Sequence, residues 1–180
     1  LIITNTEFIA EVFRSLPEGA FAAVCSKPGE PDHGGWLASR ADQMANDLPT
    51  VNNNYIGCSS FYLDDNGLFK ARKAQFAACH FLMLDDLGTK IPLALVDDFH
   101  FSWLFETSPG NYQGGIIFAE PLTDGPQAEQ LLNAIIKAGL CDSGSTAPLT
   151  RWARLPMAIN GKKNIATKRG KPSSAASPFG

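Results

Sequence analysis

The chain has 180 residues, 44% of them hydrophobic, and a net charge of −3, which fits one domain with an ordinary core, with or without a tail. No apolar run is long enough for a membrane-spanning helix, and the first residues lack the basic and apolar regions of a signal peptide. Four cysteines, at positions 25, 58, 79 and 141, lack the spacing of zinc or redox motifs, which indicates reduced, mostly buried thiols of a cytoplasmic protein.

Charge is distributed unevenly along the chain. All 18 acidic residues precede position 151, whereas about half of the 15 basic residues follow it. A basic segment beside an acidic body is typical of proteins that bind polyanions such as nucleic acid or nucleotide phosphates. The alternative is a solvated basic tail.

The first third of the sequence predicts one helix and several short elements. Residues 5–16 carry apolar side chains at helical spacing, with Thr6 as N-cap and Pro17 as the stop. The elements predicted next are a strand at 21–26, a loop at 27–36 and a short helix at 37–47. Within 52–73 the sequence predicts a strand, an Asp65-Asn66-Gly67 turn, and then a second strand or the start of a helix.

Residues 76–84 are almost continuously apolar, which predicts a central strand buried on both faces. Strands and helices are mixed, so the predicted fold class is α/β or α+β. The remaining predicted elements are a short strand at 91–96, a strand pair at 101–107 and 114–120, a helix at 124–140, and a strand or turn at 151–160. Residues 164–180 are rich in Ser, Pro and Gly and predict a basic linker after a domain at 1–163.

A polar stretch, TSPGNYQ, separates the two strands of the predicted pair. It is longer than an ordinary hairpin turn, and Ser108, Asn111 and Gln113 offer polar groups to a ligand. A glycine at position 110 allows a phosphate or sugar to approach the backbone closely. We therefore expect a binding loop here; the alternative is an irregular hairpin loop.

Of three Asp-Asp pairs, the pair Asp85-Asp86 is the candidate for chemistry because it ends the most apolar predicted strand. Two adjacent carboxylates are hard oxygen ligands that suit Mg²⁺ or Mn²⁺. Neighbouring strand residues point to opposite faces, so both reach one ion only if the strand ends or bulges there. Asp142 is the candidate third ligand. The alternatives are solvated acids at a strand end and, for Asp142, a turn residue.

Three segments in this order, LMLDDLGTK, ETSPGNYQ and RWARLPMAINGKK, resemble the motifs of the archaeo-eukaryotic primase superfamily, and most of all the RepB-type primase domains of plasmids, phages and mobile elements. The resemblance spans about residues 50–163. Many members of the superfamily separate the first two acids by one residue and carry a histidine where this chain has Gln113.

The resemblance implies an RRM-like catalytic sheet combined with an N-terminal α/β unit. It implies a DNA primase or primase-polymerase that makes primers on single-stranded DNA by nucleotidyl transfer with two divalent ions, Mg²⁺ or Mn²⁺, in the replication of a mobile element. NTPs or dNTPs would be the substrates, and a helicase domain would follow the segment. The implied catalytic and metal-binding residues are Asp85, Asp86 and Asp142, and the implied nucleotide-binding residues are Ser108, Asn111, Gln113, Arg154, Asn160 and Lys162.

Two other functions stay open. A metal-dependent phosphodiesterase or nuclease would use the same carboxylates to cleave strands without nucleotides. A non-catalytic RRM-like module that binds single-stranded nucleic acid would need exposed aromatic side chains. Tyr112, Trp103 and Trp152 are candidates for stacking or for the core, and His80 is expected to be a core histidine.

Overall fold

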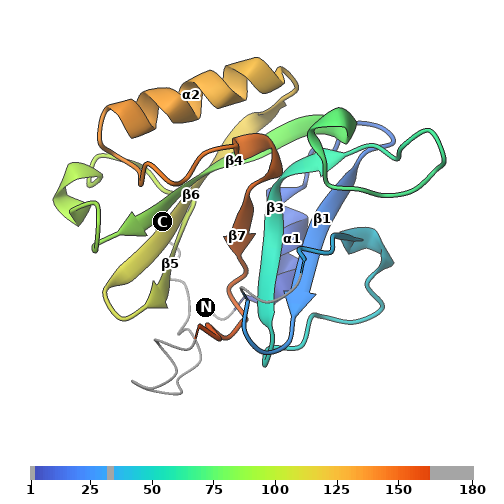
Figure 1. Ribbon diagram of the computed structural model, residues 1–180, viewed down its shortest axis with the longest axis horizontal. Coiled ribbons are helices and arrows are strands. Elements are labelled where there is room, and N and C mark those ends of the chain that lie inside the picture. Colours follow the sequence, from blue (N-terminus) through green and yellow to red (C-terminus); the bar gives the residue numbers. More distant parts are fainter. Residues whose placement is uncertain (1–2, 32–34, 163–180) are drawn as a thin grey trace.

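The computed structural model describes residues 3–31 and 35–162 of the chain. Within them, a seven-stranded antiparallel sheet has the strand order β2-β1-β3-β4-β6-β5, and β7 pairs with β3 (Figure 1). The strands are β1 (Phe21–Lys27), β2 (Ser39–Arg40), β3 (Asn53–Phe61), β4 (Phe76–Leu87), β5 (Trp103–Ser108), β6 (Asn111–Leu122) and β7 (Trp152–Arg154). The helices are α1 (Asn5–Val12) and α2 (Gly125–Lys137), with single 3₁₀ turns η1 (Ala41–Gln43), η2 (Lys73–Gln75), η3 (Leu93–Leu95) and η4 (Pro148–Thr150). The predicted mixture of strands and helices, α+β, is confirmed.

β4 is the central strand, buried on both faces as predicted. Phe81 and Met83 pack in the cluster that contains α1, while Leu82 and Leu84 pack in the cluster that contains Leu132 of α2. Successive side chains of a strand point to opposite faces, so the two helices cover opposite sides of the sheet. A nearly continuous apolar run is what such a strand requires.

α1 starts at Asn5 as predicted, but its N-cap lies two residues before the predicted one. Thr4, not Thr6, is the N-cap: its hydroxyl accepts from the Glu7 backbone N–H at 3.1 Å, and the Glu7 carboxylate accepts from the Thr4 N–H at 2.8 Å. This reciprocal capping box leaves Thr6 to bond Asp47 instead. The helix ends at Val12, short of the predicted residue 16.

Two predicted elements are wrong. Residues 37–47 form no α-helix, because Ser39 and Arg40 pair with β1 and leave only the single turn η1. Residues 91–96 form no strand: Ile91 makes one bridge to Leu87, and the turn η3 follows Pro92. At 37–47 pairing with β1 overrides the local pattern, whereas at 91–96 only Ile91 finds a pairing partner and the chain turns after Pro92.

The sheet opens into a fork between β3 and β4. These strands pair only where Ser59–Phe61 meets Phe76–Cys79, and farther along β3 pairs with β7 through Tyr55, Ile56 and Gly57. The short strand β7 therefore fills the opening between β3 and the β4–β6–β5 side of the sheet (Figure 1). This places the side chains of β7 close to the end of β4 that carries Asp85 and Asp86.

The predicted helix at 124–140 is present as α2, slightly shorter than predicted. α2 begins after Asp124, whose carboxylate accepts from the Gln127 N–H at 3.1 Å, and Gly139 follows it with a φ of 75°. All four cysteines are free and buried. No helix in the described ranges is long and apolar enough to cross a membrane. The predicted linker at 164–180 lies outside the described residues.

Candidate functional site

The acidic pair lies at a bulge in β4. Leu84 pairs with Gly114 and Leu87 with Tyr112, so β4 has one residue more than β6 between these two pairs. Asp86 takes a φ of 58°, in the left-handed region that residues other than glycine seldom adopt. The sequence predicts a strand that stops at residue 84, whereas β4 continues to Leu87. The bulge breaks its alternation, and both carboxylates line one pocket.

The turn that follows the pair brings a cation to it. The Asp86 carbonyl accepts from the backbone N–H groups of Lys90 and Ile91 at 3.0 and 3.1 Å, which folds the chain back on itself. The Lys90 ammonium then lies 2.8 Å from Asp86 and 3.2 Å from Asp142. Its hydrogen bonds to these two carboxylates raise the pKa of Lys90. Asp142 is thus joined to the acidic pair through Lys90, although it does not line the pocket.

Arg151 flanks the other carboxylate of the pair. Its Nη2 lies 3.6 Å from Asp85 Oδ2, and its guanidinium donates to the Gly144 carbonyl and the Ser145 hydroxyl, both at 3.0 Å. Arg151 therefore fastens the loop that carries Asp142 to the β4 end. The sequence did not mark Arg151 as a site residue, because the contact with Asp85 joins segments that are far apart along the chain.

The donors present suit a divalent cation, but they do not form a finished cage. Within residues 3–31 and 35–162, no group of three or more His, Cys, Asp or Glu side chains is arranged to hold a metal ion. Asp85 and Asp86 offer hard oxygens on one pocket wall, and Lys90 lies between Asp86 and Asp142. The pair fits Mg²⁺ or Mn²⁺ by its chemistry. Asp142 would join the same ion only after Lys90 moves.

The polar stretch between β5 and β6 is a tight hairpin, not the long loop that the sequence predicts. Ser108 pairs with Asn111, so Pro109 and Gly110 alone make the turn, with Gly110 at a φ of 75°. The Glu106 carboxylate accepts from the Gly110 N–H at 2.9 Å. The polar residues therefore belong to strand ends, where they are held more rigidly than in a loop.

Asn111 connects this hairpin to the turn after the acidic pair. Its side-chain N–H donates to the Thr107 hydroxyl at 3.1 Å, and the Thr89 hydroxyl donates to its side-chain oxygen. A Cβ on Gly88 would lie 2.5 Å from the Gly110 carbonyl, so the two turns are in direct contact. The acidic pair and the hairpin are positioned as one unit.

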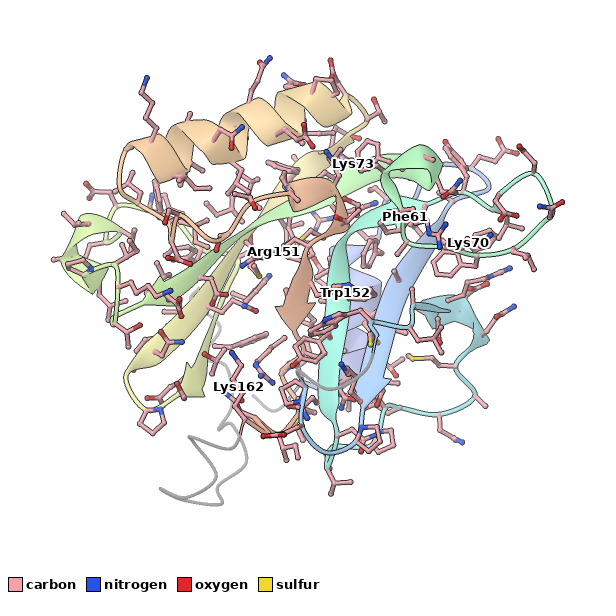
Figure 2. All side chains as sticks on the ribbon, in the orientation of Figure 1. Phe61, Lys70, Lys73, Arg151, Trp152 and Lys162 are labelled. Carbon is pink, nitrogen blue, oxygen red and sulfur yellow. The ribbon has the colours of Figure 1, made fainter. Side chains whose placement is uncertain are left out.

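Arg154 organises the opposite wall. Its guanidinium donates to the Ile159 carbonyl and to Asn160 Oδ1, both at 3.0 Å, and Asn160 donates to the Thr107 carbonyl at 2.8 Å. Its backbone N–H donates to Gln113 Oε1 at 2.7 Å, which ties the edge of β7 to β6. Figure 2 shows Arg151 and Trp152 at the upper end of β7 and Lys162 beyond its lower end.

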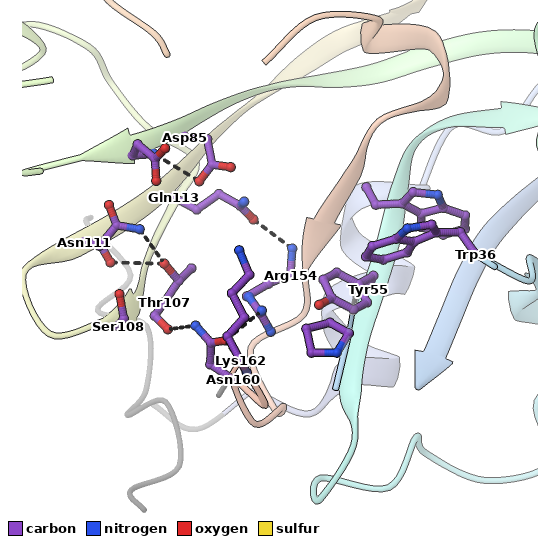
Figure 3. Close-up of a pocket in the computed structure, with 13 residues that line it drawn as sticks. Trp36, Tyr55, Asp85, Thr107, Ser108, Asn111, Gln113, Arg154, Asn160 and Lys162 are labelled. Carbon is purple, nitrogen blue, oxygen red and sulfur yellow. Dashed lines mark hydrogen bonds between the residues drawn. The ribbon is translucent and has the colours of Figure 1, made fainter. Parts of the chain in front are cut away.

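These walls enclose one pocket of about 180 Å³ (Figure 3). It is lined by eight of the nine predicted site residues, with Asp142 the exception. The eight are Asp85, Asp86, Ser108, Asn111, Gln113, Arg154, Asn160 and Lys162. Residues that are far apart in the sequence are brought together here. Their predicted roles stay predictions.

Three aromatic side chains also line the pocket, and only one of them was a candidate from the sequence. Trp36, Tyr55 and Trp152 line the same pocket, together with Pro31. Trp152 was a candidate for base stacking, whereas Trp36 and Tyr55 were not singled out by any local pattern. By contrast Trp103 and His80 are core residues, 5% and 1% exposed. Tyr112 packs partly buried against the α2 cluster.

No family model matches this sequence, and no curated protein sequence matches it. A solved structure does match: the AEP (archaeo-eukaryotic primase) domain of the cyanophage S-2L primase-polymerase, with a TM-score of 0.62 over 95% of this chain and 85% of that one. Sequence identity is 14%, a level at which the likeness shows the fold alone. The chain therefore has the mixed α+β fold of that primase-polymerase domain.

Proposed function

We propose that this chain is a primase-polymerase catalytic domain, which joins nucleotides on a single-stranded DNA template. The observation that carries the proposal is the pocket itself. In a fold shared with a primase-polymerase domain, one cavity collects the acidic pair of β4, the polar ends of the β5–β6 hairpin, and the basic segment from Arg154 to Lys162. Nucleotidyl transfer needs such a combination, with carboxylates to hold metal ions and fixed polar and basic groups to bind the phosphates.

The wall opposite the carboxylates suits a triphosphate. Arg154 presents a guanidinium that is held by Asn160 and by the Ile159 carbonyl, and Lys162 follows on the exposed chain. The Ser108 hydroxyl makes no side-chain hydrogen bond among the described residues, so it can donate to a phosphate oxygen. Charge-assisted bonds from fixed donors position the phosphates with little reorganisation.

The carboxylates would hold the divalent ions. Asp85 and Asp86 are the first ligands, and Asp142 completes the set when Lys90 gives way. Two such ions supply activation of the attacking hydroxyl and stabilisation of the leaving pyrophosphate. Before an ion binds, Lys90 and Arg151 offset two of the three negative charges and keep the segments that carry the carboxylates together. Replication of a mobile element and a helicase after residue 180 belong to the same proposal.

A second function has an observation in its favour. A non-catalytic module that binds single strands needs exposed aromatic rings, and Trp36 beside the pocket is 44% exposed. Such a module would bind DNA with the carboxylates removed. A nuclease, in turn, would cut the template without nucleotides. Neither the binding module nor the nuclease would incorporate labelled nucleotides into a product, whereas a primase would.

The test is incorporation of labelled NTPs and dNTPs on single-stranded DNA with Mg²⁺ or Mn²⁺. We expect short products, and a loss of at least about 100-fold in Asp85→Asn and in Asp86→Asn, because a lost ligand removes several kcal/mol of charge stabilisation. The matched control is Asp97→Asn with Asp98→Asn, an exposed Asp-Asp pair on a turn outside the pocket.

Products that persist unchanged in both variants would overturn the acidic site. Template binding without any product, unaffected by the two substitutions, would instead favour the binding module. Cleaved template in the absence of nucleotides would favour the nuclease.

A further inference from the structure

Three aromatic rings gather at the end of the pocket away from the acidic pair. We call Trp36, Tyr55 and Trp152 the aromatic wall. Figure 3 shows Trp36 and Tyr55 on the side opposite Asp85, with Arg154 between them. All of these residues line the same cavity. A ligand that reaches from the carboxylates past Arg154 therefore meets flat apolar surface at its other end.

The two indoles of the aromatic wall lie nearly parallel. The ring centroids of Trp36 and Trp152 are 6.3 Å apart with 18° between the planes, while Tyr55 meets Trp36 edge-on at 4.7 Å and 73°. These are the offset-stacked and edge-to-face arrangements that aromatic rings prefer. The rings are therefore held in fixed orientations before any ligand arrives, which lowers the entropy cost of stacking on them.

The sheet explains how the wall is positioned. Tyr55 of β3 stands opposite Arg154 of β7, and Trp152 lies two residues before Arg154 on the same face of the strand. The residue paired with Trp152 is Gly57, which has no side chain to cover the indole. Trp152 and Arg154 thus present a ring and a guanidinium side by side toward the cavity.

The exposure of Trp36 sets it apart from a core residue. It is 44% exposed, whereas Trp103 is 5% exposed. The Lys27 ammonium lies 4.6 Å from the Trp36 ring centroid, which helps to fix the indole without hiding it. An exposed tryptophan costs hydrophobic stabilisation that burial would have given, and such a residue at a cavity marks a binding surface.

We propose that Trp36 and Trp152 stack the base of the incoming nucleotide, with Tyr55 bracing them. This rests on the proposed function, because it takes Arg154 and the carboxylates as the phosphate end of the same ligand. One continuous cavity then fits one nucleotide, its triphosphate at Asp85 and its base on the aromatic wall. Stacking accepts every base, and purines bind more tightly because their faces are larger.

The experiment compares ligands with and without a base. Dissociation constants for ATP, CTP, inorganic tripolyphosphate and a short single-stranded DNA are measured by calorimetry, with Mg²⁺ present, for the wild type, Trp36→Ala and Trp36→Phe. We expect Trp36→Ala to weaken ATP binding about 5-fold to 100-fold, to weaken CTP less, and to leave tripolyphosphate unchanged. Trp36→Phe should keep most of the affinity.

Tyr62→Ala is the matched control, because Tyr62 is 43% exposed and lies outside the pocket. Equal weakening of ATP and tripolyphosphate would show that Trp36 only supports the fold, and this would overturn the proposal. Weaker binding of DNA alone in Trp36→Ala would assign the aromatic wall to the template strand and would also overturn the proposal. A wild type that binds no nucleotide would overturn it as well.

The failure of this inference is separable from the failure of the proposed function, because binding is read without turnover. Suppose that the protein makes no primer, but that Trp36→Ala weakens ATP binding and leaves tripolyphosphate binding unchanged. This result supports base stacking on the aromatic wall and contradicts the polymerase function. A protein that makes primers with a Trp36→Ala variant of unchanged ATP affinity contradicts the wall alone.

Discussion

At the scale of single residues, the candidate site is a balance of charges. Three carboxylates and two cations lie within ion-pair distance: Lys90 bonds Asp86 and Asp142, and Arg151 approaches Asp85. Partly solvated ion pairs of this kind contribute little to stability. We expect these ion pairs to hold the three carboxylates close together until a divalent cation replaces the basic side chains. A buried polar residue outside the site, such as His80, instead affects the stability of the fold.

His80 is the buried residue whose titration should be measurable. Burial lowers its pKa from 6.5 to about 4, and its ring lies against Phe13 and bonds the Ser60 hydroxyl at 2.9 Å. Because the folded protein resists protonation that the unfolded chain accepts, stability is full above pH 6.5 and falls as the pH drops toward 4. The loss assigned to His80 is roughly 3 kcal/mol.

The measurement is denaturant unfolding of wild type and His80→Gln at pH 7 and at pH 4.5. Gln keeps a hydrogen-bonding group for Ser60 but does not titrate, so the variant should lose less stability than the wild type between the two pH values. An identical loss in both proteins would show that other groups are responsible.

At the scale of elements, the site depends on contact between two turns. The turn after β4 and the β5–β6 hairpin meet at Gly88 and Gly110, and Thr89 bonds Asn111 beside them. Gly88 has a φ of 85° and no room for a Cβ. The position of the acidic pair relative to Ser108 and Asn111 is therefore set by a glycine that takes no part in chemistry.

Gly88→Ala should separate the two turns. Its Cβ would lie 2.5 Å from the Gly110 carbonyl, so we expect a loss of roughly 2–4 kcal/mol of stability and a weaker nucleotide affinity. Gly67→Ala is the matched control: its φ is 74°, but nothing lies within 4 Å of the added Cβ, so it should cost only about 1 kcal/mol. Chemical unfolding and nucleotide titration give both values; equal costs for the two variants would show that strain alone, without the contact, matters.

At the scale of the whole molecule, the two ends of the described chain are joined beneath the site. The Asn5 side chain, fully buried in α1, donates to the Met157 carbonyl at 2.8 Å and accepts from the Met157 N–H at 2.9 Å, across 152 positions of sequence. Asn54 of β3 also donates to the Met157 carbonyl, at 2.9 Å. The segment that follows β7 and carries Asn160 is thereby fixed to α1 and β3.

Asn5→Ala should loosen this segment. It leaves the partly buried Met157 N–H without its partner, which costs about 1–2 kcal/mol, and it should weaken nucleotide binding because Asn160 holds Arg154. The control is Thr6→Ala, in the same turn of α1, which removes an exposed hydroxyl that donates to Asp47. Its free energy of unfolding should stay within about 0.5 kcal/mol of the wild type. Thermal unfolding and nucleotide titration check both effects, and an unchanged Asn5→Ala protein would contradict this account.

The sequence by itself determined the strongly periodic elements and the identity of the polar residues. The apolar run 76–84 had to be a strand buried on both faces, and the pattern from 124 to 140 had to be a helix, because each buries its side chains with its own period. Local chemistry also marked Asp85 and Asp86 as candidates, and the motif resemblance added Arg154. These inferences need only neighbours along the chain.

The tertiary structure decided the rest, because it depends on pairing between distant segments. A bulge against β6 places Asp85 and Asp86 in one cavity, pairing with β1 removes the predicted helix at 37–47, and the tight pairing of Ser108 with Asn111 turns an expected loop into a hairpin. Only the tertiary structure, in which β7 lies in the fork of the sheet, shows that Trp36, Tyr55 and Arg151 belong to the site or its border. Side chains from five segments line this pocket, and a local sequence pattern does not determine which distant segments come into contact.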